Sequence, residues 1–345
     1  MKAAVFEQYQ TALQIRDVAV PSPGPDGVII RVAACGICRS DWHGWMGHDS
    51  DVQLPHVPGH ELAGVIHTTG SAVTRWKPGD RVTVPFCCGC GICSQCESGH
   101  QHICDQYTQP GFTQWGAFAE FVLIRHADVN LVALPPSIDF VTAASLGCRF
   151  ATSFRAVVHQ GRTKPGDWVA IHGCGGVGLS AVMIATAMGA RVIAIDVQQS
   201  RLQMARSCGA EELIDSTKHD VVQRVRSITG AGANVSIDAF GSRQTCWNSV
   251  RSLAKRGRHV QVGLMLGEES DPPIPMSAVI ANELELLGSH GMQSYEYGRM
   301  LGMITSGQLA PQKLISDTVT LEQGAVMLTQ LDKFPGQGVS VIVFP

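Results

Sequence analysis

The stretch Val169-Ala170-Ile171-His172-Gly173-Cys174-Gly175-Gly176-Val177-Gly178 decides the fold of this 345-residue chain. It joins an apolar run to a glycine turn with the pattern G-x-G-x-x-G, and a helical pattern follows over residues 179–188. A strand, a tight turn and a helix in this order are typical of dinucleotide-binding folds, in which N–H groups at the helix start face the phosphates. The sequence therefore predicts cofactor contacts at Gly173, Gly175, Gly176, Val177 and Gly178.

The second predicted strand adds to this hypothesis, because a glycine-rich turn alone also occurs for structural reasons. Residues 191–196 form an apolar run that ends in Asp196, about twenty residues beyond the glycines. A carboxylate there accepts hydrogen bonds from the adenosine ribose and repels a 2′-phosphate, which favours NAD over NADP. The alternative for Asp196 is an ordinary helix N-cap. Arg201 fits either a cation near the ribose or a solvated helix face.

Composition limits the classes of function. With 45% apolar and 16% charged residues, the chain can bury the cores of two domains. A formal net charge of −3 provides no basic field for nucleic acid or an anionic membrane surface. We find no secretory leader and no apolar run long enough to span a bilayer, so we expect a cytoplasmic protein that acts on small neutral molecules.

The chain contains twelve cysteines, and four of them share one loop with the spacing Cys90-x2-Cys93-x2-Cys96-x7-Cys104. Four thiolates so close in sequence suit a closed tetrahedral zinc site, whereas disulfides are rare in the cytosol. No coordination position is then left for a substrate, and this zinc is predicted to be structural. Cys87 and Cys88 are interpreted as bystanders.

A second group, Cys38, His60 and Cys148, is scattered along the chain. Two cysteines and one histidine make an open catalytic zinc site, in which water or substrate is the fourth ligand. Spacing alone does not join residues so far apart. Cys148 could instead be a small buried apolar residue, and His60 a structural histidine.

The chain resembles the zinc-containing medium-chain dehydrogenase/reductase family, in its alcohol dehydrogenase group, over essentially its whole length. The matching segments are Cys-Gly-Ile-Cys-Arg-Ser-Asp at 35–41, Pro-Gly-His-Glu at 58–61, the four-cysteine loop, Leu-Gly-Cys at 146–148 and the glycine turn. The resemblance implies that Cys38, His60 and Cys148 bind a catalytic zinc. It also implies Glu61 as an alternate ligand, Asp41 as the acid that orients His60, and Arg39 as a contact of the cofactor pyrophosphate.

The resemblance further implies a reaction. Zinc acts as a Lewis acid on an alcohol oxygen, and hydride passes from the alcohol carbon to NAD. Ser40 matches the family's proton-relay hydroxyl, and His43 matches the imidazole at the solvent end of the relay. The alternative for His43 is a surface histidine in a tryptophan-rich loop.

Two domains are expected, in an α/β fold that combines a GroES-like β-rich catalytic domain with a Rossmann doubly wound parallel sheet. Residues 1–150 contain short β-like runs at 28–33, 81–84 and 118–124. Residues 151–289 alternate strands with helices and are assigned to NAD binding. The family pattern returns residues 290–345 to the catalytic domain.

An apolar substrate pocket is expected. Its candidate residues, each of which could equally be core packing, are Trp42, Trp45, Phe86 and Trp115. Gly263 and Leu264, with the segment 289–292, fall where relatives contact the nicotinamide.

The predicted function is a zinc-dependent alcohol dehydrogenase that uses NAD, with an alcohol, aldehyde or ketone as substrate. The alternatives are a polyol or other specialised secondary-alcohol dehydrogenase of the same family, and a zinc- and dinucleotide-binding redox sensor without turnover. A zinc-free quinone-reductase-like relative would have no reason to keep Cys38, His60 and Cys148. By resemblance we expect two zinc ions per chain and a homotetramer.

Overall fold

The computed structural model describes residues 1–332 and 338–345, in two compact units. The first unit comprises Met1–Ala151, Gly291–Gly307 and Pro311–Pro345, and the second comprises Thr152–His290 and Gln308–Ala310. Residues 333–337, which belong to the predicted return segment 290–345, lie outside the described residues. No helix in the described ranges is long and apolar enough to cross a membrane.

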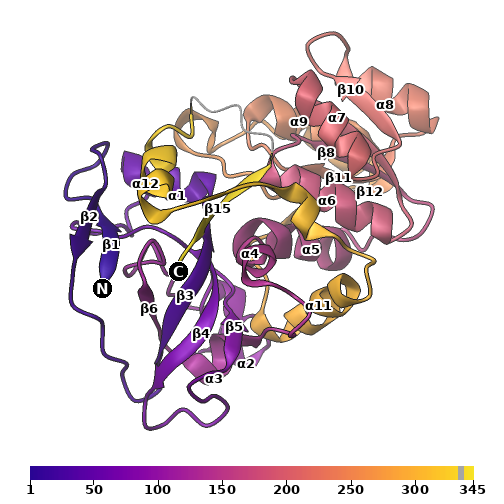
Figure 1. The fold of residues 1–345 in the computed structure, drawn as a ribbon. Coiled ribbons are helices and arrows are strands. Elements are labelled where there is room, and N and C mark those ends of the chain that lie inside the picture. Colours follow the sequence, from indigo (N-terminus) through magenta and orange to yellow (C-terminus); the bar gives the residue numbers. More distant parts are fainter. Residues whose placement is uncertain (333–337) are drawn as a thin grey trace. The chain divides into compact units, whose positions relative to one another are not determined.

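The second unit is built on a six-stranded sheet in which all neighbouring strands are parallel (Figure 1). The strand order is β10-β9-β8-β11-β12-β13. The strands are β8 (Trp168–His172), β9 (Arg191–Asp196), β10 (Glu212–Asp215), β11 (Ala233–Asp238), β12 (Leu253–Gln261) and β13 (Glu285–Gly288). The helices that connect them are α6 (Gly176–Ala187), α7 (Gln199–Ser207), α8 (Val221–Thr229), α9 (Arg243–Arg251) and α10 (Met276–Asn282).

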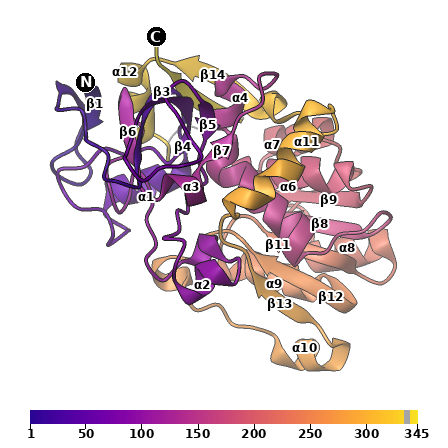
Figure 2. The ribbon, with the colours of Figure 1, turned by 90° about the horizontal axis from the view of Figure 1, so that it is seen from below.

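The order of this sheet reverses between β8 and β11. In a doubly wound sheet, the carboxyl ends of the strands at this switch point form the crevice in which ligands bind. The strands β8 and β11 are buried along nearly their whole length, because their apolar residues are covered on both faces. By contrast, β13 lies at the edge beyond β12 and is largely exposed (Figure 2). The glycine turn follows β8 directly and therefore lies at the switch point.

The first unit contains a seven-stranded, mostly antiparallel sheet with the path β14-β15-β3-β4-β5-β7, and β6 pairs with β3. A two-stranded sheet of β1 (Lys2–Val5) and β2 (Gln14–Asp17) accompanies it. The strands of the larger sheet are β3 (Val28–Gly36), β4 (Glu61–Thr69), β5 (Arg81–Thr83), β6 (Phe121–Ile124), β7 (Val132–Ala133), β14 (Ile315–Val319) and β15 (Val339–Val343). Its longest pairing, β3 with β4, has two register shifts and carries functional residues at its ends.

Short helices surround this sheet. They are α1 (Arg39–Met46), α2 (Ser94–Glu97), α3 (Ala127–Asn130), α4 (Phe140–Ala144), α11 (Tyr297–Thr305) and α12 (Leu321–Thr329), and the π-helical segment η2 (Leu146–Phe150) follows α4. A further short helix, α5 (Ala151–Phe154), follows η2 and precedes the first strand of the second unit. Buried side chains of β1, β3, β4 and β6 form the core of the unit with those of α12.

Candidate metal and cofactor sites

Cys38, His60 and Cys148 come together in the first unit, with ligand atoms that lie within 4.8 Å of one another. Cys38 is the N-cap of α1, His60 directly precedes β4, and Cys148 lies in the π-helical segment η2. Such π-helical turns often occur at functional sites. His60 is fully buried, and its Nε2 has no hydrogen-bond partner among the described residues. A buried ring nitrogen without a partner beside two sulfur atoms fits a zinc ligand.

Asp41 orients two of these three residues. Its Oδ1 accepts from Nδ1 of His60 at 2.8 Å and from the backbone N–H of Gly59 at 2.9 Å. Its Oδ2 accepts from the backbone N–H of Cys38 at 3.1 Å. Because Nδ1 carries the proton in this arrangement, the Nε2 lone pair of His60 is left for the metal. These hydrogen bonds fit the orienting role that the family resemblance implies for Asp41.

Glu61, the expected alternate zinc ligand, forms a buried ion pair with Arg149. The backbone N–H and Nε of Arg149 donate to its Oε1 at 2.9 and 3.1 Å, and Nη2 of Arg149 pairs with its Oε2. Burial raises the pKa of the Glu61 carboxyl, and the charge of Arg149 opposes this shift. Both oxygens thus contact Arg149 in a buried bidentate ion pair. The three clustered residues do not include Glu61, and its role as an alternate ligand stays a prediction. The sequence reading gave Arg149 no role, because only the fold brings it to Glu61.

Ser40 and His43 lie on α1, three residues apart and so on the same side of the helix. Sγ of Cys38 lies 3.8 Å from the Ser40 hydroxyl, which places this hydroxyl beside the ligand set. His43 is half-buried, and its Nδ1 lies 3.1 Å from Nδ1 of His48. Burial, with the charges of Arg39 and His48, lowers the pKa of His43 to about 4. Arg39 is exposed, and its guanidinium lies 5.0 Å from the centre of the Trp42 ring.

The four-cysteine loop forms a second, separate cluster. The sulfur atoms of its four cysteines also lie within 4.8 Å of one another. The sulfur of Cys104 accepts from two backbone N–H groups, those of Cys90 and Gln106, at 3.2 Å each. Hydrogen bonding from the backbone of Cys96 lowers the pKa of Cys93 to about 6, whereas burial raises the pKa values of Cys96 and Cys104. Four cysteines held in this way fit a closed zinc site.

The predicted aromatic pocket residues divide into two groups. The Phe86 ring lies 6.1 Å from the His60 ring, and the Trp42 ring lies 5.0 Å from the His43 ring. Trp45 instead belongs to the core, and its indole donates to the carbonyl of Thr11 at 2.7 Å. Phe112, which the sequence reading did not name, lies 5.4 Å from the His60 ring.

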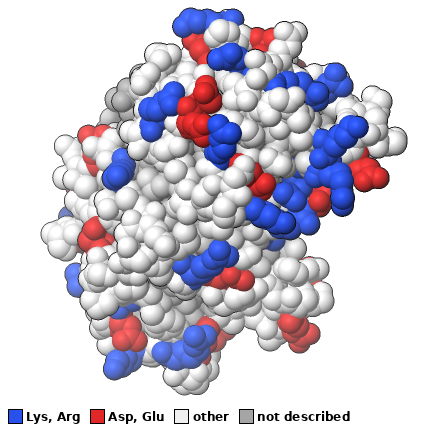
Figure 3. Space-filling view, turned by 90° about the vertical axis from the view of Figure 1, so that its right-hand side faces the viewer, with Lys and Arg blue, Asp and Glu red and all other residues white. Residues whose placement is uncertain are grey.

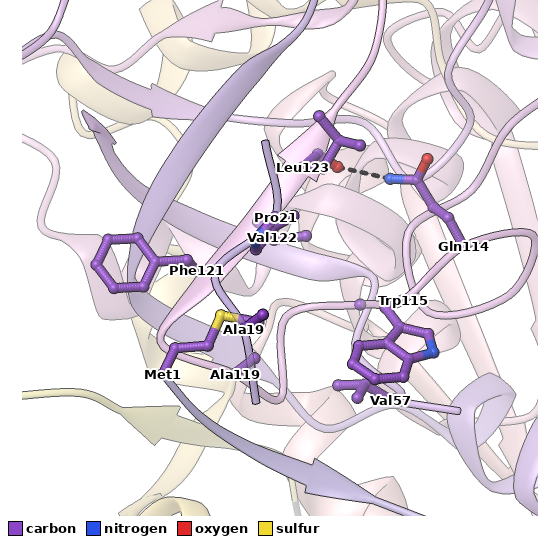
Figure 4. A pocket seen from close by; sticks show the side chains of 11 residues that line it. Met1, Ala19, Pro21, Val57, Gln114, Trp115, Ala119, Phe121, Val122 and Leu123 are labelled. Atoms are coloured by element: carbon purple, nitrogen blue, oxygen red, sulfur yellow. Dashed lines mark hydrogen bonds between the residues drawn. The ribbon is translucent and has the colours of Figure 1, made fainter. Parts of the chain in front are cut away.

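Trp115 lines a different pocket of the first unit, which has a volume of about 240 Å³ (Figure 4). Its indole donates to the carbonyl of Pro55 at 2.9 Å, and the pocket contains none of the zinc-ligand candidates. Neither Trp45 nor Trp115 is therefore placed at the ligand set, because the packing of the β domain directs both indoles to backbone carbonyls elsewhere.

In the second unit, the glycine turn connects β8 to α6. A Cβ on Gly178 would lie 1.8 Å from the carbonyl oxygen of Gly173, so the turn itself requires this glycine. A Cβ on Gly175, by contrast, would meet nothing within 4 Å. The first helical residues, Gly176 and Val177, have N–H groups without intrahelical acceptors. The open space at Gly175, directly before these donors, fits a pyrophosphate that approaches the backbone closely.

Asp196 ends β9 beside this turn. Its Oδ2 accepts from the N–H of Cys174 at 2.7 Å, and its Oδ1 accepts from the N–H of Gln198 at 2.9 Å. Each carboxylate oxygen keeps a further lone pair, so the side chain can also accept from ribose hydroxyls. It is not the N-cap of α7, because that position is Gln198 and makes no side-chain cap. Arg201 lies on α7 and is half-buried.

Exposed apolar side chains follow the carboxyl ends of three strands of this sheet. Val197 after β9 is 59% exposed, Phe240 after β11 is 62% exposed, and Leu264 after β12 is 52% exposed. Gly263 packs so closely on Gly241 that a Cβ would lie 2.3 Å from its nitrogen. Such exposure at a switch point marks a ligand surface. Phe240 was missed from the sequence, although an aromatic residue directly after an apolar strand was a signal for it.

Two family models match the chain. Residues 24–136 match the alcohol dehydrogenase GroES-like domain, and residues 176–306 match the zinc-binding dehydrogenase model. An alcohol dehydrogenase from Geobacillus stearothermophilus is 35% identical over 84% of each chain. An NAD-dependent alcohol dehydrogenase from Sulfurisphaera tokodaii is 31% identical over 99% of this chain and 100% of its own. The structure of the alcohol dehydrogenase TADH from Thermus sp. ATN1 superposes with a TM-score of 0.92 at 29% identity, over 99% of both chains.

Proposed function

Because the chain belongs to the zinc-containing alcohol dehydrogenase group of the medium-chain dehydrogenase/reductase family, we propose that it oxidises primary or secondary alcohols with NAD, reversibly. The observation that carries this proposal is the cluster of Cys38, His60 and Cys148, three ligands that leave one position open. Its surroundings contain Phe86 and Phe112, as an apolar substrate requires.

Each residue of the site has a role in this proposal. A zinc ion bound by Cys38, His60 and Cys148 would supply Lewis acidity to the alcohol oxygen. Asp41 holds His60 in the tautomer that ligates, and the Arg149–Glu61 ion pair supports the backbone beside Cys148. The Ser40 hydroxyl, which lies 3.8 Å from Sγ of Cys38, would take the proton that the alcohol loses.

The second unit supplies the coenzyme site in this proposal. The N–H groups at the start of α6 bind the pyrophosphate, and Arg39 of the first unit is proposed as a further phosphate contact. Asp196, with Arg201 nearby, selects the unphosphorylated ribose of NAD. NAD itself supplies the acceptor for the hydride. Gly263, Leu264 and the segment 289–292 are proposed as nicotinamide contacts.

A specialised polyol or secondary-alcohol dehydrogenase of the same family uses the same machinery, and the substrate alone distinguishes it. A redox sensor without turnover is disfavoured by Ser40, which lies beside a complete ligand set and would have no use there. Acidic and basic side chains are interspersed on the face in Figure 3, and the formal net charge of −3 provides no basic field for nucleic acid.

The proposed function is tested with zinc-loaded protein, NAD and a panel of short alcohols, branched secondary alcohols and polyols, with NADH absorbance as the readout. Turnover that disappears on removal of zinc and returns on its addition supports the proposal. NADH binding without oxidation of any alcohol in the panel would contradict it and favour the sensor.

A further inference from the structure

His43 and His48 form a pair of imidazole rings at the end of α1. Their Nδ1 atoms lie 3.1 Å apart, and their ring centres lie 5.4 Å apart. A contact of two ring nitrogens at this distance requires one to donate and the other to accept, so the two rings share one proton. His43 is half-buried, whereas His48 is exposed. The pair therefore reaches from the interior of the first unit to solvent.

The helix end builds this pair. Gly47 ends α1 in the left-handed conformation, with φ +82°, and a Cβ there would lie 3.1–3.3 Å from the ring of Tyr9. This turn lets the backbone N–H of His48 donate to the carbonyl of His43 at 3.0 Å. The Trp42 ring makes T-shaped contacts with both imidazoles, at 5.0 and 5.8 Å between ring centres. The two histidines thus meet because of a specific helix cap and a shared aromatic neighbour.

We propose that His48 is the outer member of a two-imidazole proton path, and that the proton released by alcohol oxidation reaches water through His48. The proposal rests on the proposed function, since it concerns the same site. It replaces the expectation that His43 itself is the solvent end of the relay, because Nδ1 of His43 faces another ring and not water.

His43 accepts a proton at Nε2, the ring nitrogen that does not face His48. It then gives its Nδ1 proton to Nδ1 of His48. His48 then releases its Nε2 proton to water, and both rings are neutral before and after the step. This path requires a neutral His43. Burial lowers the pKa of His43 to about 4, the charges of Arg39 and His48 add to this shift, and the charge of Cys38 opposes it.

The test uses His48→Gln, which removes a titrating ring and keeps a polar side chain. The enzyme–NAD complex is mixed rapidly with alcohol in dilute buffer between pH ~6 and ~9, a range that spans ordinary histidine titration. NADH absorbance and a pH indicator follow hydride transfer and proton release. We expect the variant to release protons roughly tenfold more slowly at the low end of this range. Added imidazole should restore the rate, because a soluble base replaces the missing ring.

A matched control is His219→Gln, which replaces an exposed histidine of the second unit and should behave as wild type. The affinity for NADH should be unchanged in both variants. A His48→Gln protein with wild-type proton release and no response to imidazole contradicts the proposal. Wild-type protein that oxidises no alcohol contradicts the proposed function instead.

A second measurement is independent of turnover. Nitrogen-15 NMR of labelled imidazoles measures the titration of His43 in the zinc-loaded protein without NAD. The His48→Gln change should move the pKa of His43 towards its ordinary value, because a neighbouring charge is removed. Unchanged titration of His43 would show that the rings do not share a proton, and would overturn the proposal.

Discussion

Single atoms of a few side chains define the candidate zinc centre. One carboxylate, that of Asp41, accepts from the imidazole of His60 and the backbone of Cys38, so two ligands depend on one acid. The hydroxyl of Ser40 is in turn placed by Cys38, because both lie at the first turn of α1. Replacements at these positions should therefore affect individual chemical steps while the surrounding core is retained.

We expect Ser40→Ala to lower alcohol turnover by roughly a hundredfold, because the hydroxyl acts only while the alcohol proton is leaving. NADH affinity, measured by fluorescence titration, should remain within about twofold of wild type, since Ser40 is not among the proposed phosphate contacts. Ser50→Ala, at an exposed position after α1, is the control. Near wild-type oxidation by Ser40→Ala protein between pH ~6 and ~9 would mean that the proton leaves by another route.

A second prediction concerns Asp196 and the choice between NAD and NADP. Wild-type protein should prefer NAD to NADP by at least tenfold in kcat/KM, about 1.4 kcal/mol of transition-state binding. Asp196→Gly with Val197→Arg should move this preference towards NADP, because position 197 is exposed and can present a cation to the phosphate. Absolute activity should also fall, since Asp196 supports the backbone of Cys174. Equal efficiency of wild type with both coenzymes would refute the assignment.

The two candidate metal sites differ in how many secondary-structure elements supply their residues. Cys38, His60 and Cys148 come from α1, the start of β4 and η2, so these elements must pack before the cluster exists. The four-cysteine loop lies within one segment around α2. A return segment also holds this loop, because Tyr295 and Gln293 both donate to the carbonyl of Gly99 at 2.8 and 3.1 Å.

Substitutions in the four-cysteine loop and in the cluster of Cys38, His60 and Cys148 should have different effects. We expect Cys93→Ser to lower the melting temperature and the yield of folded protein, because the loop loses a structural ligand. Cys148→Ser should instead leave a folded protein that binds NAD and turns over poorly. Elemental analysis should give two zinc ions in wild type and one in each variant. Fully active wild-type protein with a single zinc would contradict this prediction.

A buried polar chain crosses the sheet of the second unit. It runs from His172 of β8 through Ser236 of β11 and Ser249 of α9 to His259 of β12, with contacts of 3.1, 2.8 and 2.7 Å. Burial lowers the pKa of His172 to about 3 and that of His259 to about 4. Both rings are therefore neutral in the folded unit above these values.

We predict that the second unit loses folding stability at acid pH. The unfolded chain binds protons at these histidines near pH 6.5, whereas the folded unit does not. Stability is therefore complete above pH 6.5 and is lost as the pH falls towards 4, on the order of 1.4 kcal/mol per pH unit for each ring. Denaturant unfolding of NAD-free protein between pH 5 and 7.5 measures this slope. His259→Gln should flatten it and His219→Gln should not. Parallel slopes in all three proteins would refute the account.

Across the full chain, the predicted fold class is confirmed by the GroES-like and zinc-binding dehydrogenase matches and by the parallel sheet. One edge of that sheet, β13, leaves backbone groups without a neighbouring strand among the described residues. Apolar side chains near it are exposed, including Met276 at 53%, Ile280 at 76% and Leu286 at 37%. This edge suits pairing with a second copy of the chain.

The family resemblance predicts a homotetramer, and we expect the second units to pair along the edge strand β13. Light scattering measures the assembly state of the wild-type protein. Leu286→Glu should shift the protein to smaller species, because a charge replaces apolar contact area. Val326→Glu, on an exposed face of α12, should leave assembly unchanged. A monomeric wild type would contradict the prediction.

The features that followed from the printed residues alone are local ones. The G-x-G-x-x-G turn and the four-cysteine loop depend on residues within about twenty positions, where chain geometry leaves few arrangements. Strand and helix patterns identified the second unit, although β10, α8 and α10 were not predicted. The trio Cys38, His60 and Cys148 came from resemblance to a family and not from spacing.

Contacts between distant segments required the folded chain. Arg149 meets Glu61 across 88 positions, and Trp45 and Trp115 turn away from the ligand set. His48 joins His43 only because Gly47 reverses the chain after α1. Tertiary packing determines these pairs, because a side chain can contact only the residues that neighbouring elements place beside it. Local sequence limits the conformation of a turn or loop, whereas the free energy of burial selects which distant side chains meet.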